Sequence, residues 1–350
     1  MRATIQDVAR EAGVSITTVS HVLGERGRVA AATRERVKRA AASLGYRANV
    51  HAQQLMTRHS RTFAVQIANS VQATDGCSLV PNSEYFLELL NGAAEVADER
   101  SYALVMASPT SSPFDLAQFA VDGVILVDPT GEESWFSPEL KPKPPIVTTA
   151  RPIVRGRRIR AVVDHQLQDA AATMLDHLWE QGYRKPAFIT TRRTRSYTWD
   201  LTEGYRSWAE AKGITHRVVE IAEQPTLQDA GQALASLLDS KTPPDAVFTS
   251  AEYLAIGALH EAQNRGISVP AELGVCSAVD SGALQLTSPQ ITGMFAFPRD
   301  VGRQAASALI DVIEGTTEPP RFIGVPVELR VRRSTMRGFP AGATAMRHLA

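Results

Sequence analysis

The chain of 350 residues is poor in cysteine. Its two cysteines, Cys77 and Cys276, lie far apart, and neither has a histidine or a second cysteine at metal-ligand spacing. A disulfide framework and a zinc site are therefore not expected. This cysteine usage is typical of a protein in a reducing compartment.

Long apolar runs are also missing. No run approaches the roughly 18 residues that a transmembrane helix needs. The N-terminal segment is charged and amphipathic, whereas a secretory signal has an apolar core. We therefore expect a cytoplasmic protein that has no membrane partner.

Motifs that position catalytic groups are absent from the sequence. It has no G-x-S-x-G elbow, no P-loop, no G-x-G-x-x-G after a predicted strand, and no cluster of His, Cys and acidic residues at metal spacing. The eight histidines follow no partner pattern. We expect no catalytic residue, metal or cofactor.

The net charge is zero, but the charge is distributed unevenly. Residues 1–60 hold ten Lys or Arg and four Asp or Glu, a net charge of +6. Because the whole chain has 37 of each kind, the remainder carries −6. A basic head on an acidic body indicates that the head binds a polyanion. The length and the 44% apolar content predict several folded domains.

The head has the periodicity of three short helices. Thr4 and Asp7 predict a capping box at the start of the first helix, and Gly13 predicts its end. Ser15 and Thr33 are expected to cap the second and third helices. The apolar positions of the first and third helices are Ile5, Val8, Ala9 and Ala12, and Val37, Ala40, Ala41 and Leu44.

The second helix has two different faces. Val19, Val22 and Leu23 are expected to point into the head. The opposite face carries Ile16, Thr17, Ser20 and His21. Such side chains can hydrogen-bond base edges or contact a thymine methyl group, and a helix fits the major groove. The alternative is a helical hairpin in an all-helical module.

The segment "TIQDVAREAGVSITTVSHVLGERGRVAAATRERVKRAAASLGYRANVHAQQL", residues 4–55, resembles the DNA-binding head of the lactose-repressor (LacI/GalR) family of bacterial transcription regulators. The resemblance implies that Ile16, Thr17 and His21 read bases in the major groove. It also implies phosphate contacts by Thr4, Ser15, Ser20, Arg34 and Asn49.

The segment "NVHAQQL" resembles the hinge helix of this family, which orders on operator DNA and inserts a leucine into the minor groove. Asn49, Ala52, Gln53 and Leu55 occupy the corresponding positions. An apolar side chain between base pairs unstacks a flexible step, and the bend brings more protein surface onto the DNA.

Beyond residue 61, predicted strands alternate with amphipathic helices. The strands are expected near 62–68, 103–107, 123–127, 145–149, 186–191, 217–221, 245–249, 273–279 and 291–295. The helices are expected near 84–100, 165–181, 200–213, 227–240, 252–265 and 299–315. This alternation predicts parallel sheets covered on both faces.

The body also resembles the family, in segments such as "VDGVILV" and "VGRQAASALIDVIEG". The expected fold is an all-α helix-turn-helix head with an α/β periplasmic-binding-protein-like body of two doubly wound parallel-sheet lobes. The expected domains are a head (1–48), a hinge helix and linker (49–61), a two-lobed body (62–335) and a tail (336–350). Lobe 1 is expected at about 62–163 and 296–325, and lobe 2 at about 164–295 and 326–335.

An effector cleft is expected between the lobes, at the carboxyl ends of the strands. The candidate effector residues are Tyr85, Phe86, Asp164, Trp199, Glu252 and Asp280. Among the departures from the family in this cleft, Leu201 replaces a usual arginine and Val279 a usual aspartate. Arg192, Arg193 and Arg195 are expected in a solvated loop, with an anion site as the alternative.

Together these features predict a transcription regulator, by default a repressor. The alternative is a cytoplasmic small-molecule-binding protein or an enzyme with a fused DNA-binding head. Two heads about one helical turn apart read a palindrome, so we expect a homodimer on a double-stranded operator. A small-molecule effector is expected to act through the cleft. Sugars and related metabolites are the candidate classes.

Overall fold

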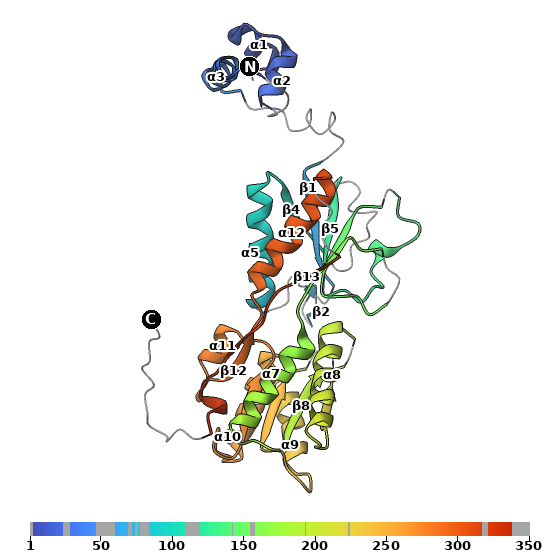
Figure 1. The fold of residues 1–350 in the computed structure, drawn as a ribbon, viewed down its shortest axis with the longest axis vertical. Coiled ribbons are helices and arrows are strands. Elements are labelled where there is room, and N and C mark those ends of the chain that lie inside the picture. Colours follow the sequence, from blue (N-terminus) through green and yellow to red (C-terminus); the bar gives the residue numbers. More distant parts are fainter. Residues whose placement is uncertain are drawn as a thin grey trace. The chain divides into compact units, whose positions relative to one another are not determined.

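The computed structural model describes residues 3–23, 29–46, 60–68, 72–73, 76–77, 84–108, 120–141, 143–154, 158–192, 194–222, 225–316 and 321–337. Contacts between residues divide the chain into two compact units, residues 1–61 and 62–350. Each unit is described by itself, and the element labels are those of Figure 1.

The first unit contains the three helices α1 (Ile5–Ala12), α2 (Ile16–Leu23) and α3 (Ala31–Ser43). The capping box of Thr4 and Asp7 is present, and Gly13 ends α1 in the left-handed conformation at φ 60°. The Ser15 hydroxyl accepts a hydrogen bond from the Thr18 amide at 3.1 Å. One small core joins the helices: Val8, Ala9, Ala12, Val19, Val22, Val37, Ala40 and Ala41.

Two expectations for α3 are wrong. The helix begins at Ala31, two residues before the expected cap Thr33, and its N-cap Ala30 makes no side-chain hydrogen bond. Leu44 follows the helix and is 36% exposed, so it lies at the edge of the core. Helical spacing fixes the buried face of α3, but it does not fix the first turn when alanines precede the threonine.

The second unit contains two six-stranded sheets. Sheet 1 is parallel throughout. Its order is β13 (Phe322–Gly324), β7 (Ala161–Asp164), β6 (Ile146–Thr149), β5 (Gly123–Val127), β1 (Thr62–Ile67) and β4 (Ala103–Ala107). A separate hairpin pairs β2 (Gln72–Ala73) with β3 (Gly76–Cys77).

Different segments pack on the two faces of sheet 1. Helices α5 (Glu84–Glu99) and α12 (Pro298–Glu314) pack on the face that carries Phe63, Val65 and Ile125, and they lie side by side in Figure 1. The alternate residues, such as Ala64 and Leu126, pack with Trp135 of the 3₁₀ segment η2 (Ser134–Phe136). Because both faces are buried, β5 reads as a continuous apolar run.

Sheet 2 has helices on both faces. Its order is β14 (Glu328–Arg330), β12 (Thr292–Phe295), β11 (Gly274–Ser277), β10 (Ala246–Thr249), β8 (Pro186–Thr191) and β9 (Val218–Ile221), with β14 alone antiparallel to its neighbour. One face packs on α7 (Leu167–Glu180) and α8 (Ser196–Ala211) through Phe188 and Phe248. The other packs on α9 (Leu227–Leu238) and α10 (Glu252–Asn264) through Ile189 and Val247. A short helix α11 (Gly282–Gln285) and the segment η3 (Arg333–Thr335) complete this part.

The two sheets confirm the predicted α/β body of two parallel-sheet lobes, which we call lobe 1 (sheet 1) and lobe 2 (sheet 2). The principal strands and helices lie within a few residues of their expected bounds. Helix α8 is the main exception, because it begins at Ser196 and not near residue 200. The three-residue strands β13 and β14 were not expected, since they are too short to show periodicity.

The chain passes between the lobes three times. The crossovers are residues 165–166 from β7 to α7, residues 296–297 from β12 to α12, and residues 325–327 from β13 to β14. His165 Nδ1 lies 3.0 Å from the carbonyl oxygen of Val325, which joins the first and third crossovers. No helix within the described ranges is long and apolar enough to cross a bilayer.

Helices α5 and α12 approach each other so closely that glycine is required on both. A Cβ atom at Gly302 would lie 1.9 Å from the Leu89 carbonyl oxygen, and one at Gly92 would lie 1.9 Å from the Arg299 carbonyl oxygen. Both obstacles are backbone atoms, which cannot move without shifting a helix. The glycines therefore set the distance between the two helices that cover sheet 1.

We expect Gly302→Ala to lower the free energy of unfolding by about 1–3 kcal/mol, because the methyl group forces α5 and α12 apart. Urea denaturation of the full chain measures the effect. Gly231→Ala is the matched control, since a Cβ there meets its nearest neighbour at an ordinary 3.5 Å and alanine favours the helix by up to about 1 kcal/mol. Equal stability of the two variants would contradict the prediction.

Candidate functional site

The outer face of α2 is the candidate nucleic-acid interface. Ile16 is 46% exposed, although it is a large apolar residue. Thr17 and His21 are exposed and Ser20 is half-buried, whereas Val19 and Val22 on the opposite face are buried. The structure therefore brings these four outward residues together on one helix face.

The candidate phosphate-binding residues lie around this helix. The Thr4 hydroxyl caps α1 and donates to an Asp7 carboxylate oxygen at 2.7 Å. These hydrogen bonds hold the pKa of Asp7 below its usual range. Ser15 caps the start of α2, and Arg34 is half-buried on α3. The hinge candidates Asn49, Ala52, Gln53 and Leu55 lie outside the described residues.

In the body, several candidate effector residues lie at the carboxyl ends of strands. Asp164 ends β7 and is 6% exposed. Tyr85 and Phe86 stand in the first turn of α5, with ring centroids 5.4 Å apart in an edge-to-face arrangement. Burial raises the pKa of the Tyr85 hydroxyl, and the nearby carboxylates of Asp128 and Asp164 raise it further. The Tyr85 hydroxyl therefore lies within electrostatic range of both carboxylates.

Residues of lobe 2 extend this site. Burial raises the pKa of the Tyr197 hydroxyl, with further contributions from Tyr253, Asp128 and Glu252. The Asp128 carboxylate thus raises the pKa of one tyrosine in each lobe. We call Tyr85, Asp128, Asp164, Arg195, Tyr197 and Glu252 the interlobe cluster. Trp199 lies two residues beyond Tyr197 in the first turn of α8 and is 43% exposed.

Arg195 joins the lobes directly. Its guanidinium donates to the carbonyl oxygens of Asp128 at 2.8 Å and of Ala68 at 3.5 Å, and the residue is 8% exposed. The expectation of a solvated loop is therefore wrong for Arg195, because α8 begins one residue later and directs this side chain toward lobe 1. Arg192 is exposed, and Arg193 lies outside the described residues.

Two further contacts connect the lobes. Arg151, which follows β6, forms an ion pair with Asp200 of α8. A carboxylate oxygen of Glu84 in α5 accepts a hydrogen bond from the Gly282 amide at 2.7 Å. Asp128, Arg195 and Tyr197 were not among the candidate effector residues. Their one sequence signal is position, since each follows the carboxyl end of a predicted strand.

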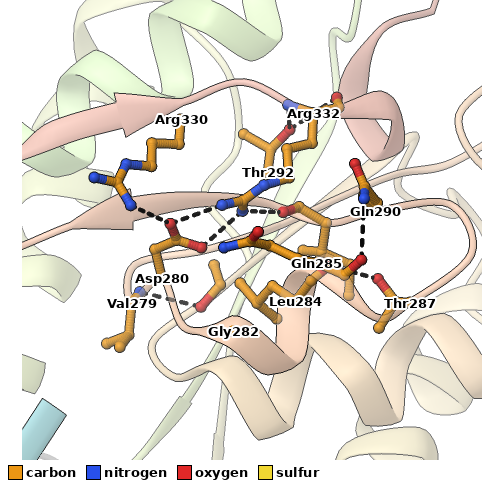
Figure 2. Close-up of polar contacts among 12 residues, drawn as sticks. Val279, Asp280, Gly282, Leu284, Gln285, Thr287, Gln290, Thr292, Arg330 and Arg332 are labelled. Carbon is orange, nitrogen blue, oxygen red and sulfur yellow. Dashed lines mark hydrogen bonds and ion pairs between the residues drawn. The ribbon is translucent and has the colours of Figure 1, made fainter. Parts of the chain in front are cut away.

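Asp280 has different partners from the other candidates. Figure 2 shows its carboxylate held by Arg332, at 2.7 and 2.8 Å, and by Arg330 at 3.4 Å. The Asp280 side chain is 1% exposed. Both oxygens are thus engaged by arginines of the C-terminal part of the chain.

The structure explains the departure from the family at Leu201. Leu201 is 2% exposed and packs in the core beneath α7 and α8. The position of the usual arginine is therefore part of the apolar core of lobe 2. Val279 is half-buried next to Asp280. Six residues before Leu201, Arg195 places a guanidinium between the lobes, where it donates to the Asp128 carbonyl oxygen.

We expect Asp164 to make the stability of the body depend on pH. Burial raises the pKa of its carboxyl group to about 6, although the amides of His165 and Arg151 lower it in part. The folded state therefore binds this proton more tightly than the unfolded chain does. The free energy of unfolding should fall by about 2 kcal/mol as the pH rises from 4 to 7.

Asp164→Asn cannot titrate, so its stability relative to the parent chain should rise over the same pH range. Urea denaturation at several pH values measures this difference. Asp169→Asn, an exposed position on α7, is the control. The same pH dependence in both variants would contradict the assignment to Asp164.

Comparison with known proteins gives two family matches. Residues 4–49 match the model of the lacI family of bacterial regulatory proteins, and residues 175–335 match the model of the periplasmic binding protein-like domain. Catabolite control protein A of Priestia megaterium is 27% identical, over 96% of this chain and 100% of its own length. The HTH-type transcriptional regulator CelR of Thermobifida fusca is 28% identical, over 95% of this chain and 98% of its own.

Solved structures agree with these matches. A complex of the transcriptional regulator CelR with cellobiose has a TM-score of 0.66 and 26% identity, and covers 95% of this chain and 100% of that one. A lac repressor dimer bound to operator and the anti-inducer ONPF has a TM-score of 0.73 at 21% identity, and covers 96% and 100%. With the helix-turn-helix head and the two-lobed body, these matches show that the head belongs to the lacI family of bacterial regulatory proteins and that the chain is a DNA-binding transcription regulator.

Proposed function

We propose that the chain is a cytoplasmic repressor that binds a palindromic operator as a homodimer and responds to a small-molecule effector between its lobes. The observation that carries the proposal is the outward face of α2, with Ile16, Thr17 and His21 exposed on a head whose net charge is +6. A catalytic role is not proposed, because the relatives are named as regulators.

In this proposal α2 lies in the major groove. Ile16 contacts a thymine methyl group, and Thr17 and His21 hydrogen-bond base edges. The phosphate contacts come from Thr4, Ser15, Ser20, Arg34 and Asn49. The hinge residues Ala52, Gln53 and Leu55 contact the minor groove. A single head buries too little surface for operator affinity, so two heads act together across a dyad.

The proposed effector site is the interlobe cluster with Phe86 and Trp199. Asp280 is left out, because its carboxylate is already bound by Arg332 and Arg330. Carboxylates beside aromatic rings suit a ligand that carries hydroxyl groups, and the relative CelR is described in complex with cellobiose. An effector that contacts both lobes favours one lobe arrangement by its difference in affinity for the two.

The operator can be found by selecting bound sequences from a random pool of duplex DNA with the full chain. We expect a palindrome whose half-sites lie about one helical turn apart. Binding should weaken strongly as salt rises, since phosphate contacts release counterions. Absence of duplex binding at low salt would reject the proposal.

We expect His21→Ala to weaken binding to the selected operator by about 5- to 150-fold, which corresponds to the 1–3 kcal/mol of one base contact. Binding to random duplex should change little. Ser43→Ala, an exposed polar position at the end of α3, is the matched control. Fluorescence anisotropy measures the affinity for each duplex. An equal loss of affinity for the operator and for random duplex would exclude base reading by His21.

Leu55→Ala tests the proposed minor-groove contact. The variant should lose far more affinity for the operator than for random duplex, because only the bent operator accommodates the apolar side chain. The same anisotropy assay applies. If Leu55→Ala leaves the ratio of the two affinities unchanged, the leucine has no such role.

A further inference from the structure

The crossover from β12 to α12 contains an unusual backbone conformation. Phe297 has φ 45° and ψ 56°, in the left-handed region. Among the residues of the three crossovers, all of which the structure describes, it is the one with a positive φ. A bulky side chain disfavours this region, and the following Pro298 favours an extended backbone at Phe297. Contacts elsewhere must therefore hold Phe297 in place.

The Phe297 side chain is held from both lobes. Its ring packs against the core of lobe 1. It also meets the ring of Phe295 in an edge-to-face contact, with centroids 4.8 Å apart. Phe295 is the last residue of β12 and belongs to lobe 2. The two rings thus join the lobes at the point where the chain crosses.

Phe295 is itself held by Arg330. The guanidinium carbon of Arg330 lies 3.6 Å from the centroid of the Phe295 ring, a stacked cation–π arrangement. Arg330 ends β14, the strand that follows the third crossover. The stack therefore ties the second crossover to the third.

Asp280 fixes the position of the Arg330 guanidinium. Its carboxylate lies 3.4 Å from Arg330 and forms a two-point pair with Arg332 (Figure 2). The Asp280 amide donates to the Met294 carbonyl oxygen at 2.8 Å, next to Phe295. A continuous chain of contacts thus leads from Asp280 through Arg330 and Phe295 to the backbone of Phe297.

We propose that Arg330 is a positioning residue for the lobes: through Phe295 it holds Phe297 in the left-handed conformation, and this sets the angle between lobe 1 and lobe 2. Without the stack, Phe297 relaxes toward an extended backbone and redirects α12. The effect on effector response rests on the proposed function, but the effect on lobe angle does not.

The test measures the distance between spin labels on the two lobes of the full chain. Labels at Ala94→Cys on α5 and Glu210→Cys on α8 occupy exposed positions, with Cys77→Ser to remove a second attachment point. Cys276 is fully buried. Excess unlabelled chain suppresses distances between copies.

The informative variant is Arg330→Lys, which keeps the charge facing Asp280 and loses the planar stack. We expect a second or shifted distance in Arg330→Lys and a broad distribution in Phe297→Gly. Glycine at position 297 has no side chain that the Phe295–Arg330 stack could hold. Adding Arg330→Lys to Phe297→Gly should therefore leave the distance distribution unchanged. Arg303→Lys, which alters an arginine paired with Glu95 and Glu99 within lobe 1, should resemble the parent chain.

A distribution for Arg330→Lys that matches the parent chain would overturn the proposal, even if its thermal stability falls. So would an equal shift from Arg330→Lys in the Phe297→Gly background. If Phe297→Gly does not fold, the comparison of Arg330→Lys with Arg303→Lys decides. Failure to bind any operator would reject the proposed function and leave this comparison intact.

Discussion

The parallel direction of the strands is the constraint that arranges the body. Parallel strands place all their carboxyl ends at one edge of a sheet, and the polar residues that follow each strand gather there. Asp164 follows this rule in lobe 1, and Arg195 and Tyr197 follow it in lobe 2. The direction of the strands, more than the identity of any single residue, therefore decides where the interlobe cluster lies.

Burial then decides the electrostatic character of the cluster. Carboxylates removed from water hold their protons more tightly, as at Asp164. A buried guanidinium needs acceptors, and Arg195 finds them in the backbone carbonyls of lobe 1. The same requirement accounts for Asp280, which is buried and satisfied by two arginines. Groups of one chemical type thus serve different purposes according to what surrounds them.

The helices of the head have a buried side and an exposed side. Eight buried side chains hold three short helices together, and the opposite face of α2 stays exposed. An isolated helix of eight residues is marginal in water, so its shape depends on this core. The core therefore holds the exposed side chains of Ile16 and Thr17 on a well-defined helix.

Periodicity in the sequence is enough to predict the class of the fold, most element positions and the outward face of α2, because helical and strand periodicities are local properties of neighbouring residues. It did not determine the partners of Asp280 or Arg195, or the left-handed backbone of Phe297. Arg332 lies 52 residues beyond Asp280, and Arg195 lies 67 residues beyond the carbonyl that it contacts. Such pairs form only when the sheets close and the crossovers bring distant strands together, so the tertiary structure alone decided which polar residues remain for a ligand.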